Sequence, residues 1–252
     1  MMTNIAWDDA EGPLLPKGPP PVPLDQAEGM AEAARDIAEC YRVLEKGGSN
    51  VVAEILRTQD TFYEWNHYPD GDVYDRDSHG QYYYHAHPSP LRDSEHGHFH
   101  TFLRAAGMAE GVRPAPLPES VERPLGGDAL SHLVAISMDR RGYPVRLFTT
   151  NRWVTGETWY DATDVAGMID RFVIDHASPS WPTNRWISAM IRLFKPQILQ
   201  LLEERDAAVT LWQKGHPEES VYEDRDLEVT SSMRISVDTQ VRNISAVLNR
   251  LR

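Results

Sequence analysis

The chain has only one cysteine, Cys40, among its 252 residues. A single thiol cannot form an intrachain disulfide, and it cannot supply a multi-cysteine zinc or iron–sulfur site. The apolar runs are far shorter than the roughly 20 residues that a membrane-spanning helix needs. The N-terminal residues include Asp8, Asp9 and Glu11 instead of a basic region followed by an apolar stretch. We therefore expect no secretory signal, no membrane partner and a cytoplasmic location.

Positive charge is also scarce. The 25 Lys and Arg residues are outnumbered by 38 Asp and Glu residues, which gives a formal net charge of −13. A chain of this charge repels a phosphate backbone, so we expect no nucleic-acid partner. Phosphate-binding glycine loops and the Gly-x-Ser-x-Gly motif of serine hydrolases are missing from the sequence. Nucleotide cofactors and a serine nucleophile are therefore disfavoured.

Histidine is concentrated in one region. Seven of the ten histidines fall between His67 and His100. Two His-x-His elements stand out within this region, one at His85 and His87 and the other at His98 and His100. Neutral imidazole is the commonest protein ligand for transition metals, and it is available near neutral pH. The spacing therefore predicts a site for a divalent transition metal.

The local sequence indicates how these histidines are presented. Residues 81–87 have strand composition, and a strand would place Tyr83, His85 and His87 on one face. Residues 96–104 favour a second strand, with His96, His98 and His100 on one face. The alternative is a helix from residue 94, in which His96 and His100 lie one turn apart. Residues 69–78 are rich in Pro, Gly and Asp and predict a loop.

A hairpin is predicted from residues 131–138 and 144–153, with a turn at 139–142. In its first strand His132 would share a face with Val134 and Ile136 and point toward the core. An eighth histidine is thereby expected near the cluster.

The remaining pattern predicts an α+β fold, with a single largely antiparallel sheet flanked by helices. Apolar spacing predicts helices over residues 25–46, 163–176, 183–212 with a kink at Pro196, and 238–251. We expect a proline-rich N-terminal arm over residues 1–24 and one α+β domain over residues 25–252. The arm is a candidate for contact with a second copy of the chain, which would make a homo-oligomer.

Two resemblances follow from these motifs. His98-Phe99-His100 followed by His132 resembles the metal-binding strands of α-type carbonic anhydrases, over fewer than ten residues. The long C-terminal helices depart from that mostly β fold, so the likeness implies local geometry only. The stretches Gln81 to Pro88 and Glu95 to Phe102 resemble a bacterial domain family of unknown function with a His/Tyr-rich signature. That resemblance implies no activity.

The chemistry of these residues leaves three functions open. The candidate metal ligands are His85, His87, His96, His98, His100 and His132, and the candidate catalytic residues are Glu95, Glu157 and Tyr83. Two histidines and a carboxylate suit ferrous iron, whereas three histidines suit zinc and an activated water. Our lead hypothesis is a non-haem iron oxidoreductase acting on a small molecule, with iron favoured over zinc. The alternatives are a zinc-dependent hydrolase or lyase and a non-catalytic metal-sensing or interaction protein. Without a metal, the histidines would form a buried hydrogen-bonding network or an acid/base site.

Overall fold

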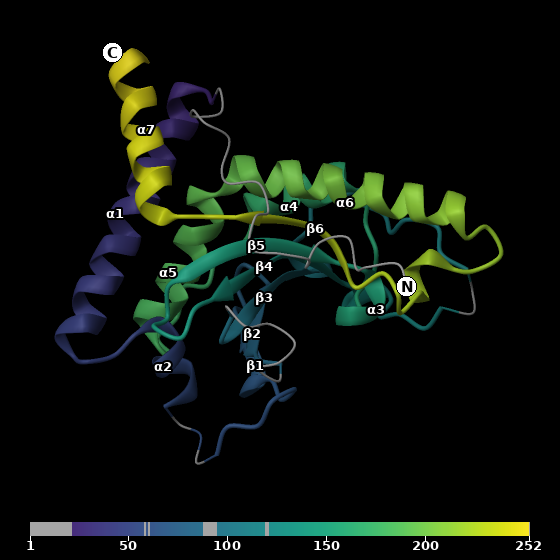
Figure 1. Cartoon of the computed structure of the whole chain (residues 1–252), viewed down its shortest axis with the longest axis horizontal. Helices are drawn as coiled ribbons and strands as arrows, with labels where there is room; N and C mark the ends of the chain where they lie inside the picture. Colours follow the sequence, from purple (N-terminus) through teal and green to yellow (C-terminus); the bar gives the residue numbers. More distant parts are fainter. Residues whose placement is uncertain (1–21, 58, 60, 88–94, 119–120, 252) are drawn as a thin grey trace.

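The computed structural model describes residues 22–57, 59, 61–87, 95–118 and 121–251. Over these residues the chain folds into one six-stranded antiparallel sheet with seven α-helices around it (Figure 1). The expected α+β fold with a single flanked sheet is thereby confirmed. Of the predicted arm, residues 1–21 lie outside the described part of the chain, and Leu24 already belongs to the first helix. None of the described helices combines the length and apolar character needed to cross a bilayer.

The sheet is a simple meander in which each strand pairs antiparallel with the next. Its strands are β1 Tyr68–Tyr74, β2 Gly80–His85, β3 Gly97–Arg104, β4 Leu130–Met138, β5 Pro144–Thr150 and β6 Val229–Arg234. The prediction of a loop over residues 69–78 was wrong for β1, which pairs with β2 as an edge strand. Its register shifts between Tyr68 and Val73, where Pro69 and Gly71 lie. Edge strands tolerate such irregularity because only one side of the strand must pair.

Seven helices accompany the sheet: α1 Leu24–Lys46, α2 Val51–Leu56, α3 Arg152–Thr155, α4 Ala162–Ile169, α5 Trp181–Leu193, α6 Lys195–Gly215 and α7 Val237–Leu251. The helix predicted over 25–46 is confirmed. The one predicted over 163–176 ends earlier, at Ile169. The long helix predicted across Pro196 divides at Phe194 into α5 and α6. A proline ring there cannot donate the backbone hydrogen bond that would join them.

The two faces of the sheet differ in chemistry. On one face Tyr84, Phe99 and Ile136 belong to a large apolar cluster with residues of α1, α2, α4, α5 and α6. Figure 1 shows α6 running across this side of the sheet. The opposite face carries His85 on β2 and His98 on β3, which are paired across the strands. Strand alternation therefore separates the histidines from the main hydrophobic core.

A β-bulge in β4 decides where His132 points. Thr101 pairs with Val134, and the next residue of β3, Phe102, pairs with His132. Leu133 is thus the extra residue, and it reverses the alternation on its N-terminal side. The prediction that His132 shares a face with Val134 was wrong, because the bulge turns the imidazole to the face that carries His100.

The predicted hairpin is confirmed as β4 and β5. In its turn, Oδ1 of Asp139 accepts hydrogen bonds from the backbone N–H groups of Arg141 and Tyr143, at 2.9 and 2.8 Å. The second strand ends at Thr150, earlier than residue 153, because Arg152–Thr155 forms the short helix α3.

Candidate metal centre

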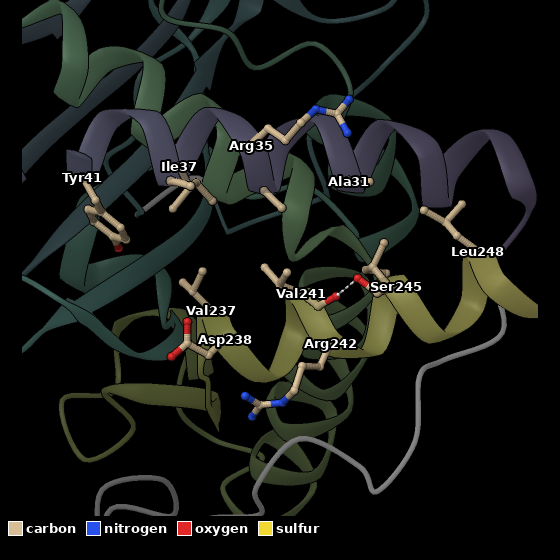
Figure 2. Close-up of a pocket in the computed structure, with 13 residues that line it drawn as sticks. Ala31, Arg35, Ile37, Tyr41, Val237, Asp238, Val241, Arg242, Ser245 and Leu248 are labelled. Atoms are coloured by element: carbon tan, nitrogen blue, oxygen red, sulfur yellow. Dashed lines mark hydrogen bonds between the residues drawn. The ribbon is translucent and has the colours of Figure 1, made fainter. Parts of the chain in front are cut away.

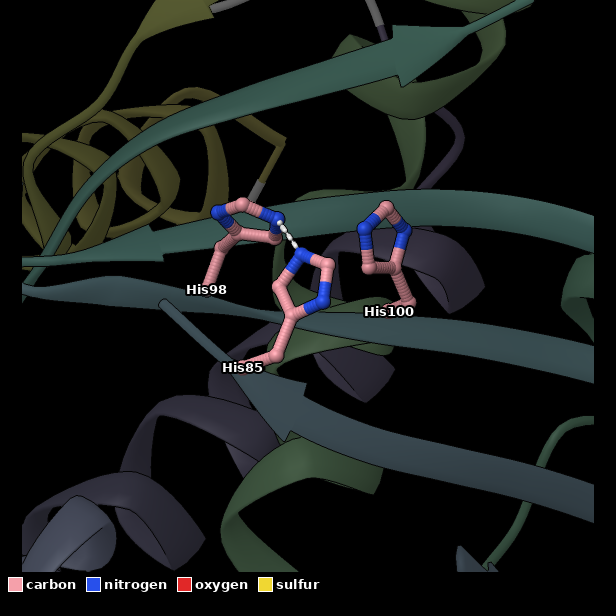
Figure 3. A group of neighbouring side chains, drawn as sticks. All are labelled: His85, His98 and His100. Atoms are coloured by element: carbon pink, nitrogen blue, oxygen red, sulfur yellow. Dashed lines mark hydrogen bonds between the residues drawn. The ribbon is translucent and has the colours of Figure 1, made fainter. Parts of the chain in front are cut away.

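Three histidines converge on the sheet face that lies opposite the main core. One ring nitrogen from each of His85, His98 and His100 lies within 4.8 Å of the other two. All three are buried, with exposed fractions of 8, 1 and 0% respectively. Figure 3 shows the His85 ring rising from β2 toward the two rings of β3. We call these residues the histidine trio, and they form a group that could hold a transition metal ion.

Two rings of the trio meet directly. Nε2 of His85 and Nε2 of His98 are 2.7 Å apart, as in a hydrogen bond that shares one proton (Figure 3). Nitrogen ligands of a tetrahedral metal with bonds of about 2.0–2.1 Å lie about 3.3 Å apart. An increase of well under 1 Å in the distance between the two nitrogens would therefore allow both of them to bind one metal ion.

Glu95 is directed at His98. Its Oε1 lies 2.6 Å from Nδ1 of His98, and both side chains are buried. A carboxylate in this position accepts the Nδ1–H hydrogen bond, so Nε2 of His98 carries the lone pair that faces the trio. Glu95 was predicted as a catalytic residue, and its Oε1 serves the imidazole in this arrangement.

His132 stands in the same relation to His100. Nδ1 of His100 lies 3.0 Å from Nε2 of His132. Burial, assisted by the positive charge of Arg205, lowers the pKa of His132 to about 3, so its ring is neutral. A neutral His132 can accept a hydrogen bond from the Nδ1–H of His100, which leaves Nε2 as the ligating nitrogen of His100. His132 thus contacts one member of the trio.

Glu157 contacts His132 and lies further from the trio than His132 does. Its Oε2 accepts the backbone N–H of His132 at 2.6 Å, and Thr155 donates to Oε1 at 3.4 Å. Burial raises the pKa of Glu157 to about 7, while Arg205 acts in the opposite direction. Its carboxylate is therefore an anchor for β4 in this structure, with no direct contact to the trio among the described residues.

Two arginines lie close to Glu157 in the structure. Arg152 donates to the backbone oxygen of Glu157 at 3.1 Å and forms an ion pair with Glu223 at 2.6 Å. The Arg205 guanidinium is buried on α6, 4.1 Å from the ring centroid of Trp159. A charged residue in the middle of a helix normally indicates a solvated face, so Arg205 carries no sequence signal.

His96 belongs to the other side of the sheet. Its Nδ1 lies 2.6 Å from the hydroxyl of Tyr84, and its ring stacks with that of Phe62 at 5.8 Å. β3 begins only at Gly97, so strand alternation does not extend to His96. A Cβ on Gly97 would lie 2.5 Å from both the backbone oxygen of His85 and the Tyr84 hydroxyl. The absence of a side chain there allows β3 to approach β2 at the start of the site.

His87 and Tyr83 border the trio. The His87 ring lies 5.2 Å from that of His98 and 4.9 Å from that of His85. The Tyr83 ring lies 5.1 Å from that of His100. Burial raises the pKa of Tyr83 well above its usual value, so its phenol keeps its proton at neutral pH. Of the predicted residues, three form the trio, and His87, Glu95, His132 and Tyr83 surround it.

The protein family described as "Domain of unknown function (DUF6969)" matches residues 31–235. The chain belongs to this family. The predicted resemblance to a domain family of unknown function is thereby confirmed. No curated protein and no solved structure matches the chain.

This DUF6969 chain also has an apolar groove between α1 and α7, with a volume of about 650 Å³ (Figure 2). Its walls include Ile37 from α1 and Val241 and Leu248 from α7. None of the predicted site residues lines it. The groove is therefore separate from the candidate metal centre.

Proposed function

We propose that this DUF6969 chain is a metal-dependent enzyme that acts on a small molecule. A divalent transition metal would be held by His85, His98 and His100. The convergence of three buried imidazoles is the observation that carries the proposal. Three protein ligands leave further positions for water and substrate, as catalytic metal sites require.

The hydrogen-bond partners of the trio favour a metal site over a purely structural hydrogen-bonding network. Metal-ligating histidines characteristically donate their second N–H to a carboxylate or another acceptor, which fixes the tautomer. Glu95 can play that part for His98 and His132 for His100. Both contacts use Nδ1 and direct Nε2 toward the trio. A network that served packing alone would have no need to orient two rings in this way.

The set of donor atoms favours zinc and hydrolase or lyase chemistry. Oε1 of Glu95 faces His98, which leaves a trio of nitrogen donors rather than two histidines and a carboxylate. A bound zinc would act as a Lewis acid and lower the pKa of a coordinated water. The burial of the trio within the sheet face would keep bulk water away from the reacting atoms.

The non-haem iron oxidoreductase predicted from the sequence is the second candidate. The observation in its favour is Tyr83, an oxidisable phenol with its ring 5.1 Å from that of His100. Iron in this site would rest on three histidines instead of the mixed ligand set. Analysis of the metal in protein purified without an affinity tag separates iron from zinc.

The trio supports an enzyme better than a metal sensor. His85 and His98 face each other on paired strands of the sheet. A site built in this way on rigid elements is preorganised, whereas a sensor needs an element with two arrangements. A large change in fold or oligomeric state upon addition of metal would favour the sensor.

Metal content tests the site itself. We expect about one equivalent of metal in the wild type and under a tenth of that in His98→Ala, because one of three ligands is lost. His216→Ala is the matched control, since His216 hydrogen-bonds with the backbone oxygen of Trp212 on α6. Retention of full metal by His98→Ala would contradict the proposal.

A second experiment tests whether the metal has an open position. In the cobalt-substituted protein, added azide should change the visible spectrum, because an external anion can enter the coordination sphere of a catalytic site. A spectrum that stays unchanged at saturating azide would indicate a closed, structural site and would contradict the enzymatic proposal.

A further inference from the structure

Two exposed rings pack against side chains that border the histidine trio. Trp65 is 57% exposed, and the side chain of His67 is 47% exposed. They are two residues apart in the segment that leads into β1.

Each of these rings is connected to the trio through an intermediate ring, and His67 also lies edge to face with His85 at 5.8 Å. The Trp65 ring packs edge to face with that of His87, at 4.3 Å, and His87 stacks with His98 at 5.2 Å. The result is a layered arrangement that runs from the surface to a proposed metal ligand.

The second layered arrangement runs through Tyr83. The His67 ring lies flat on that of Tyr83, at 3.6 Å with 9° between the planes. Tyr83 in turn contacts the ring of His100 at 5.1 Å. The two exposed rings are thus connected to two different members of the trio.

The backbone holds Trp65 in a specific conformation. Its φ is +74°, a region that side chains other than glycine rarely adopt. Its N–H donates to the backbone oxygen of Ala86 at 2.9 Å, which ties the segment to the end of β2. Nδ1 of His67 lies 3.3 Å from Asp72 on β1. Strained conformations of this kind persist where the surroundings impose them, and they cluster at ligand sites.

We propose that Trp65 and His67 form an aromatic rim that binds a planar aromatic substrate. This inference rests on the proposed function, because the metal-binding group of that substrate would reach the trio past His87 and Tyr83. Flat rings at the rim favour a flat partner, since stacked and edge-to-face contacts add to the gain from apolar burial. The substrate class is therefore aromatic small molecules that carry an oxygen group able to ligate the metal.

Two probes distinguish the contribution of the aromatic rim to binding from the contribution of the metal. Benzohydroxamate and acetohydroxamate carry the same chelating group, and they differ in a phenyl ring against a methyl group. In the zinc-loaded wild type we expect benzohydroxamate to have a Kd about tenfold lower. In Trp65→Ala the ratio of the acetohydroxamate Kd to the benzohydroxamate Kd should fall to about two or less. The Kd of acetohydroxamate and the zinc content should stay unchanged.

Matched variants control for general effects. Trp181→Ala removes an indole that is 47% exposed at the start of α5, and it should keep the tenfold ratio. His67→Ala should lower the ratio, and His67→Phe, which retains a ring, should largely restore it. This pair also provides the test if Trp65→Ala does not fold.

The outcomes distinguish the two proposals. The rim is overturned if zinc binds stoichiometrically but the wild type shows no preference for benzohydroxamate, or binds neither probe. It is also overturned if Trp65→Ala, or His67→Ala where that variant replaces it, keeps the full preference. Failure of the wild type to bind zinc or another transition metal would instead overturn the proposed function, and the rim with it.

Discussion

Oε1 of Glu95 lies 2.6 Å from Nδ1 of His98, in a position where both side chains are almost completely shielded from solvent. This contact fixes which nitrogen of His98 faces His85. It also predicts a graded effect of mutation, because an amide oxygen can still accept a hydrogen bond whereas a methyl group cannot.

Replacement of Glu95 should weaken metal binding without removing a ligand. We expect Glu95→Ala to raise the Kd for zinc by about 10- to 100-fold, and Glu95→Gln to raise it less. Competition with a chromophoric chelator measures both values. Glu39→Gln, which changes an exposed carboxylate on α1, is the control. Equal affinities of Glu95→Ala and the wild type would remove Glu95 from the site.

His132 should matter through its acceptor nitrogen. His132→Phe removes the partner of Nδ1 of His100 at 3.0 Å, and we expect the Kd for zinc to rise by about tenfold or more. His132→Gln offers an amide oxygen and should recover part of the loss. If the Phe and Gln variants bind zinc equally well, the hydrogen bond has no role in metal binding.

Glu157 should make the stability of the metal-free protein depend on pH. Because burial raises its pKa from 4.5 to about 7, the folded protein holds this proton more tightly than the unfolded chain. The resulting stabilisation is complete below pH 4.5 and is lost as the pH rises through about 7.

Urea unfolding of Glu157→Gln measures this effect. The free energy of unfolding of the variant, measured relative to that of the wild type, should increase by about 2 kcal/mol between pH 5 and pH 8, because the wild type loses stability over this range. The amide oxygen retains the acceptor for the backbone N–H of His132. A relative stability that is constant over this range would show that Glu157 titrates near its ordinary value in the folded protein.

Gly97 should tolerate no side chain. Its Cβ would lie 2.5 Å from the backbone oxygen of His85, so Gly97→Ala must displace β3 from β2. We expect a loss of about 2 kcal/mol or more in unfolding free energy, together with weaker metal binding. Gly29→Ala on α1 meets nothing within 4 Å and should be stabilising by about 0.5–1 kcal/mol. Similar stabilities for the two variants would contradict the close approach of β2 and β3.

The composition of the histidine region was informative because its strands alternate regularly. Once residues 81–87 and 96–104 are interpreted as neighbouring strands, His85, His98 and His100 fall on one face. The same logic fails beyond the strand ends. β2 ends at His85 and β3 begins at Gly97, so His87 and His96 follow loop geometry that alternation does not describe.

Long-range pairing limits the prediction elsewhere. The bulge at Leu133 depends on how β4 matches β3, and no local signal marks it, so the face of His132 could not be derived from sequence. β1 was missed because Pro69, Gly71 and Asp72 are typical of loops, whereas an edge strand with shifted register accepts them. The burial of Glu157 beside Arg205 likewise arises from tertiary packing.

Crystallography at the absorption edge of the bound metal provides the most direct test of the central claim. We predict a single anomalous peak between β2 and β3, with one nitrogen each from His85, His98 and His100 at about 2.0–2.1 Å. A fully metal-loaded crystal in which the peak lies elsewhere, or in which His85 and His98 remain hydrogen-bonded to each other, would contradict it.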